Sequence, residues 1–159
     1  MTLLLAPLFM QGLLMGLDDL ILHRRRGLPR WERIGHPIDT LSVIVCVLYL
    51  LLSRPDPIAF LSLAAFSCLL VTKDEVVHSS VCEPIEHWLH AVLFLLHPVC
   101  LYSLYRLRSQ GELFVLRIFL EAITLFFFHQ IFSWNYLWKS TIKSTTTSES
   151  AGTQRRMTP

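Results

Sequence analysis

Residues 38–73 contain two apolar runs joined by a short proline-containing connection, and they read IDTLSVIVCVLYLLLSRPDPIAFLSLAAFSCLLVTK. Proline disfavours helix in the residue that precedes it and lacks the N–H that a helix interior needs. The connection Ser53-Arg-Pro-Asp-Pro57 therefore predicts a tight turn between two helices. The uncharged parts of these runs, 40–53 and 57–72, contain 14 and 16 residues. Both are short for transmembrane helices, which need about 20.

Three longer apolar runs flank this pair. The sequence therefore predicts five spans, at residues 3–22, 38–53, 57–73, 85–105 and 113–138. Hydrophobic residues make up 53% of the chain and charged residues 16%, whereas soluble domains carry about 25% charged residues. We expect an all-α integral membrane protein, a bundle of about five transmembrane helices with a four-helix core plus one. This domain covers residues 1–139, and the polar residues 140–159 predict a disordered tail.

Lysine and arginine are unequally distributed between the predicted connections. Ten of them fall on one side of the bundle: Arg24, Arg25, Arg26, Arg30, Arg33, Lys73, Lys139, Lys143, Arg155 and Arg156. The opposite side holds Arg54, Arg106 and Arg108. The positive-inside rule then places the N-terminus outside and the tail in the cytoplasm, and we expect the inner membrane of a bacterium. The net charge of +2 and the absence of a basic face exclude nucleic acid as a partner.

Residue types that bind metals are concentrated at one end of this predicted bundle. Seven lie between residues 74 and 90: Asp74, Glu75, His78, Glu83, Glu86, His87 and His90. The first connection and its flanks add Asp18, Asp19, His23, Glu32, His36 and Asp39. On the predicted topology all thirteen fall at the cytoplasmic ends of the first four spans, and His129 reaches the same level from the fifth. Charged groups in or near hydrocarbon are costly, so each is a functional candidate.

Helical spacing pairs many of these side chains on common faces. A spacing of four positions (i,i+4) relates Asp19 to His23, Asp74 to His78, Glu83 to His87, and Glu86 to His90. A spacing of three positions (i,i+3) relates Glu75 to His78 and His36 to Asp39. Such carboxylate and histidine pairs are typical of two-metal sites in helical bundles. The predicted ligands are Asp19, His23, His36, Asp39, Asp74, Glu75, His78, Glu86, His87, His90 and His129. Glu75, Glu83 and Glu86 are the candidate catalytic carboxylates.

Several of these residues also have simpler interpretations. Glu32 fits an exposed salt bridge with Arg33, and His97 fits a packed histidine, a deep metal ligand or a haem ligand. Glu121 fits an internal ion pair with Arg117, one turn before it. Trp134, like its neighbours Tyr136 and Trp138, fits an interfacial aromatic belt.

The predicted function is that of a membrane metalloenzyme with two divalent metal ions, iron first, with zinc or manganese as alternatives. It would oxidise a lipid or other apolar substrate with O2, with the help of a redox partner. The HxxxH and HxxHH boxes of membrane di-iron desaturases and hydroxylases are absent, so the sequence assigns no family. One alternative is a zinc-dependent lipid hydrolase. The other is a carrier without enzymatic activity, either for metal ions or for electrons through a haem held by His97 and His129.

Overall fold

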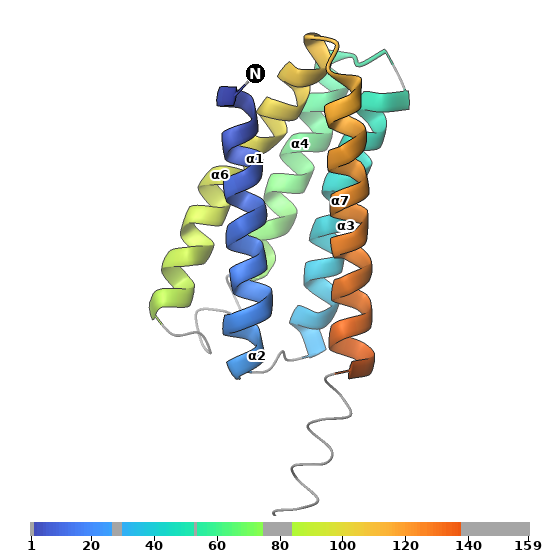
Figure 1. Ribbon diagram of the computed structural model, residues 1–159. Coiled ribbons are helices and arrows are strands. Elements are labelled where there is room, and N and C mark those ends of the chain that lie inside the picture. The colour runs from blue at the N-terminus through green and yellow to red at the C-terminus, as the bar shows by residue number, and fades with distance from the viewer. Residues whose placement is uncertain (1, 27–29, 53, 75–83, 138–159) are drawn as a thin grey trace, which may run out of the picture.

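The computed structural model describes residues 2–26, 30–52, 54–74 and 84–137, and it is almost entirely helical there, with no strand. Five longer helices form the bundle: α1 (Thr2–Leu17), α3 (Arg30–Leu52), α4 (Pro57–Val71), α6 (Pro84–Ser109) and α7 (Leu113–Phe132). Short elements extend them: the π-helical turn η1 (Asp18–Leu22), α2 (His23–Arg26), the 3-10 turn η2 (Thr72–Asp74) and the π-helical turn η3 (Ser133–Leu137). The longer helices lie side by side and alternate in direction (Figure 1). The predicted all-α bundle is confirmed.

Within the described residues, four helical segments are long and apolar enough to cross a membrane: Thr2–Leu22, Arg30–Leu52, Pro84–Ser109 and Leu113–Tyr136. The fifth helix, α4, has 15 residues. At 1.5 Å per residue it is roughly 22 Å long, shorter than the hydrocarbon core of about 30 Å. The orientation of the bundle in a membrane stays a prediction.

Local chemistry explains most helix boundaries. Asp56 caps α4, because its carboxylate accepts the Ala59 N–H at 2.9 Å, and Pro57 occupies the first helical position. The predicted turn before Pro57 is therefore confirmed. Gly111, with a φ of 80°, separates α6 from α7. Pro84 begins α6, where a proline is well tolerated, and Glu86 lies in its first turn.

Two predicted boundaries are wrong. We expected a helix to begin near residue 38, but α3 begins at Arg30 and carries Pro37 in its interior. Pro37 and Glu32 are both buried, so packing of this first part of α3 offsets the lost backbone hydrogen bond at the proline. We also expected the helix from residue 57 to run through residue 73, and its further continuation to about residue 78 lies outside the described residues. Instead α4 ends at Val71, where the Thr72 hydroxyl donates to the Leu69 carbonyl at 2.7 Å, and a 3-10 turn follows.

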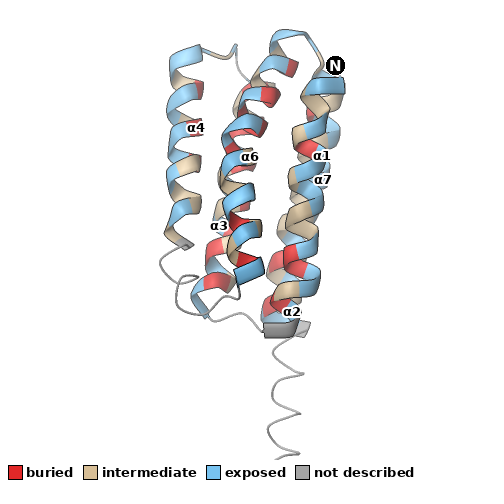
Figure 2. Ribbon diagram, turned by 90° about the vertical axis from the view of Figure 1, so that its left-hand side faces the viewer, coloured by how far each residue is buried: buried red, intermediate tan, exposed pale blue. Residues whose placement is uncertain are grey.

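The two halves of the bundle differ in what they bury. Near the C-terminal end of α3 and the α6–α7 connection, the core of the bundle is apolar, and Leu50, Leu104 and Leu107 are fully buried. Towards the other end many of the buried residues are polar or charged, such as Asp18, His23 and Glu86. Large apolar side chains such as Leu95 and Leu125 are exposed on the outer surface, and buried residues line the inward faces of the helices (Figure 2). This pattern suits a bundle with lipid outside and a polar site inside one end.

Candidate metal centre

Three parts of the chain each bring one carboxylate and one histidine to the polar end of the bundle. The pairs are Asp18 and His23 from η1 and α2, Glu32 and His36 from α3, and Glu86 and His90 from α6. Five of these side chains are buried, and His36 is partly buried. A buried charge is costly unless it is paired or binds a cation. Three carboxylates in one buried cluster therefore call for positive charge beside them.

The six residues form two overlapping groups of ligand-type atoms. One atom each from Asp18, His23, Glu86 and His90 lie within 4.8 Å of one another, and so do atoms from His23, Glu32 and His36. His23 belongs to both groups, and it is 1% exposed. Each group can hold a metal ion.

The contacts of His23 differ from those of an ordinary buried histidine. Its Nε2 lies 3.5 Å from Asp18 Oδ2 and 3.4 Å from Glu86 Oε1, whereas charge-assisted N–H to carboxylate bonds are about 2.7–2.9 Å long. Neither ring nitrogen has a hydrogen-bond partner among the described residues. Nearly all buried side-chain polar atoms in proteins are hydrogen-bonded. Converging but unbonded donor atoms are typical of ligands arranged around a cation.

A π-helical turn explains why Asp18 and not Asp19 joins this group. The spacing of Asp19 and His23 would place them together on a regular α-helix, but residues 18–22 are π-helical, and the His23 N–H donates to the Asp18 carbonyl. A turn closed between residues five apart brings Asp18 and His23 onto one face. Single π-turns occur frequently at functional sites. His90 Nε2 then lies 3.0 Å from Asp18 Oδ2.

Asp19 contacts α7 and the turn after it. The Trp134 indole N–H donates to Asp19 Oδ1 at 2.6 Å, and His129 Nε2 lies 3.2 Å from Asp19 Oδ2. His129 thus contacts Asp19, and both residues lie outside the two groups. We expected Trp134 in an interfacial belt, but it is 2% exposed. Its ring also lies edge-on to His23, with centroids 6.1 Å apart, so it contacts two residues of this end of the bundle.

Replacing Trp134 by phenylalanine should destabilise the folded chain by about 2 kcal/mol, because the buried Asp19 carboxylate loses its short hydrogen bond. The thermal unfolding midpoint in detergent should fall. Trp88→Phe is the matched control, because Trp88 is 73% exposed and its replacement should leave the midpoint nearly unchanged. Equal midpoints for the two variants would contradict this role of Trp134.

Other predicted ligands lie elsewhere. Asp39 Oδ1 contacts Lys73 Nζ at 2.6 Å, so this carboxylate is neutralised by a lysine outside both groups. His87 is partly exposed and also outside them. The predictions for Glu75, His78 and Glu83 and for the side chain of Asp74 fall outside the described residues, as does the predicted tail 140–159.

The sequence left two interpretations of Glu32 open, a functional candidate at this end of the bundle and an exposed partner of Arg33. Glu32 is 0% exposed and lies in the group with His23 and His36, so the exposed interpretation is wrong. Its spacing of four residues from His36 was a visible signal. We did not use this spacing, because Pro37 predicted a helix that begins after His36.

His97 is a packed histidine with both ring nitrogens in contact with polar side chains. Nε2 lies 2.9 Å from Ser67 Oγ and Nδ1 lies 3.2 Å from Gln11 Nε2. The Ser67 hydroxyl continues to Ser42 at 2.7 Å. A haem between His97 and His129 would have to break these bonds, and this disfavours the haem alternative.

A cavity of about 670 Å³ leads from the outer surface to the cluster. Its walls come from α1, α3, α6 and α7 and include Asp18, His23, His36 and His90. Helix α1 packs mainly on α6 and α7 mainly on α3, whereas α1 and α7 contact each other little. Phe9 of α1 and Ile118 of α7 line the cavity and are also 74% and 50% exposed. The cavity therefore opens sideways between α1 and α7, the two helices at the front of Figure 1.

No protein-family model, curated protein or solved structure matches this chain. The properties of the site therefore rest on its own residues.

Proposed function

We propose that this protein is a membrane metalloenzyme that holds two metal ions, iron first, and oxidises a lipid or other apolar substrate with O2. The observation that carries the proposal is the pair of ligand groups that share His23 beside an apolar cavity. On the predicted topology this centre lies at the cytoplasmic face.

The donor set supports two ions of a borderline divalent metal. Three carboxylates and three histidines supply oxygen and nitrogen donors, which suit iron, manganese or zinc. Carboxylate and histidine pairs on facing helices are the pattern of di-iron bundles. Iron, when bound, would supply the activation of O2.

The cavity supports an apolar substrate. Its volume falls in the range of about 300–1,000 Å³ that small-molecule sites occupy. Along α1 its lining runs from Leu5 to Asp19, which is roughly 20 Å at 1.5 Å per residue. One leaflet of the hydrocarbon core is about 15 Å thick, so the cavity suits a single extended lipid chain that enters from the side. The apolar walls would keep bulk water from the metal ions, and reduction would need a redox partner.

Zinc-dependent hydrolysis of a lipid is the second candidate. Asp18 Oδ1 is buried without a hydrogen-bond partner among the described residues, and Asp18 lines the cavity. A carboxylate oxygen in this position suits a general base beside a zinc-bound water. The identity of the metal separates the two candidates.

Metal analysis of the purified chain tests the proposal. We expect about two iron atoms per chain by mass spectrometry, with Mössbauer signals of a coupled pair. A content of two zinc atoms per chain would instead favour the second candidate, hydrolysis of a lipid. A chain expressed in iron- and zinc-supplemented cells that contains neither metal would contradict both candidates.

A further inference from the structure

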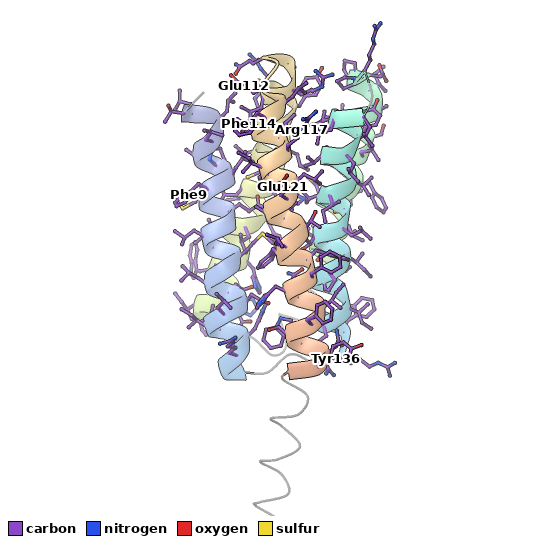
Figure 3. All side chains as sticks on the ribbon, turned by 45° about the vertical axis from the view of Figure 1, so that its right-hand side comes forward. Phe9, Glu112, Phe114, Arg117, Glu121 and Tyr136 are labelled. Carbon is purple, nitrogen blue, oxygen red and sulfur yellow. The ribbon has the colours of Figure 1, made fainter. Side chains whose placement is uncertain are left out.

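The outer face of α7 carries two opposite charges in the middle of an otherwise apolar span. Its exposed stripe follows spacings of three and four residues: Phe114, Arg117, Glu121, Leu125, Phe128 and Phe132. Figure 3 shows Phe114, Arg117 and Glu121 along the outer surface of this helix. Spacings of three and four are typical of a helix that packs against another helix.

Arg117 and Glu121 form no ion pair with any residue that the structure describes. We expected an internal pair between them, and this prediction is wrong, because the two exposed side chains form no ion pair with each other. Side chains on a helix lean towards its N-terminus, so arginine before glutamate at this spacing is the weaker order for a pair within one helix. Each charge thus points away from the bundle without compensation.

The depth of these charges makes lipid a poor environment for them. The span Leu113–Tyr136 has 24 residues, and Glu121 lies about 5 Å from its midpoint at 1.5 Å per residue. A charge so close to the centre of a bilayer is costly, and such residues usually face protein. Arg117 lies about 6 Å closer to the end of the helix, a separation of one turn.

We infer that this stripe binds the same stripe of a second copy of the chain. Two parallel copies related by a twofold axis along the membrane normal have equivalent residues at equal depth, so Arg117 of each copy would lie one turn from Glu121 of the other. The offset of one turn, about 6 Å, is within the reach of an arginine side chain. Both charges of each copy are then paired, so the stripe is complementary to itself. The apolar residues of the stripe would complete the contact. This interface lies on the outside of the bundle, so each copy would keep a complete candidate metal centre of its own.

Charge reversal with two differently tagged full-length copies tests this inference. Wild-type copies should co-purify from membranes. R117E with R117E, and E121R with E121R, should co-purify roughly tenfold less, because each combination places like charges together. R117E with E121R should recover co-purification, because one copy then carries two acids and the other two arginines. The double variant R117E/E121R should also pair with itself.

R106E is the matched control, because Arg106 is an exposed arginine at the end of α6, and its reversal should leave co-purification unchanged. Far-UV circular dichroism of each variant checks that it folds. Wild-type copies that do not associate would overturn the inference. Association that persists in the charge-reversal variants would also overturn it. The same holds if the stripe binds an unrelated protein while copies of this chain do not associate.

Discussion

Replacing His23 by alanine should remove both metal ions from the purified protein. His23 belongs to both ligand groups, so each ion loses a ligand. His36→Ala should remove only one ion, because His36 belongs to the group with Glu32 alone. The loss of one ligand from a centre with three or four should lower the affinity by roughly 10–100-fold or more. Mass spectrometry should thus give about two, one and zero ions per chain for the wild type, His36→Ala and His23→Ala.

His97→Ala is the matched control for this series. His97 is a buried histidine that lines the same cavity, but it contacts Ser67 and Gln11 and no carboxylate. It should retain both ions. His87→Ala separates the sequence prediction from the structure, because His87 was a predicted ligand and lies outside both groups. Equal loss of metal from His23→Ala and His36→Ala would show a single ion, and full retention by His23→Ala would contradict the centre.

The helices could be predicted from the sequence because long apolar runs follow a simple rule. Apolar runs of sufficient length form spans, and Pro57, Pro84 and Gly111 mark boundaries that local backbone chemistry decides. Pro37 failed as a boundary because tertiary packing decides there. The segment from Arg30 to His36 buries Glu32 against the cluster, and the helix continues through the proline to keep it there.

The structure brings some of the predicted ligands together, in two groups that also include residues outside the predicted set. Glu86, His90, His23 and His36 were expected and lie in the two groups. Asp18 replaced Asp19 because a π-helical turn changes the repeat from four residues to five, and helical spacing alone cannot reveal such a turn. Trp134 was missed because an aromatic residue near the end of a span usually faces the interface. Only the tertiary fold shows that its indole reaches Asp19.

Three ligand-type side chains between residues 74 and 90 are described by the structure. Glu86 and His90 lie in one of the two groups, and His87 lies outside them. Glu32 and His36, which precede a proline, contribute as much. Contacts between α3, α6 and the end of α1 bring these pairs together, and a single sequence does not encode such contacts in any local pattern.

Replacing Gly12 by phenylalanine should close the cavity without disturbing the metal centre. Gly12 lines the cavity, and a Cβ atom added to it would meet no atom within 4 Å, so the ring can enter the space that we assign to a lipid chain. A lipid chain that has to share the cavity with this ring would be overpacked, at a cost of about 1–3 kcal/mol. The occupancy of the cavity by lipid should then fall roughly five- to hundredfold. Photolabelling in membranes with a long-chain alkyl diazirine measures this loss on cavity peptides.

Gly16 provides the matched control on the same helix, one turn further along. A Cβ atom there also meets nothing within 4 Å, but Gly16 does not line the cavity. Gly16→Phe should therefore leave the labelling of cavity peptides unchanged, and both variants should retain the metal content of the wild type. If the cavity peptides of Gly12→Phe are labelled as strongly as those of Gly16→Phe, the lipid chain does not occupy this cavity. An unchanged metal content in the same variant would show that the metal centre is intact. If Gly12→Phe instead loses metal, the cavity and the centre are not separable, and the substrate would have to reach the ions by another path.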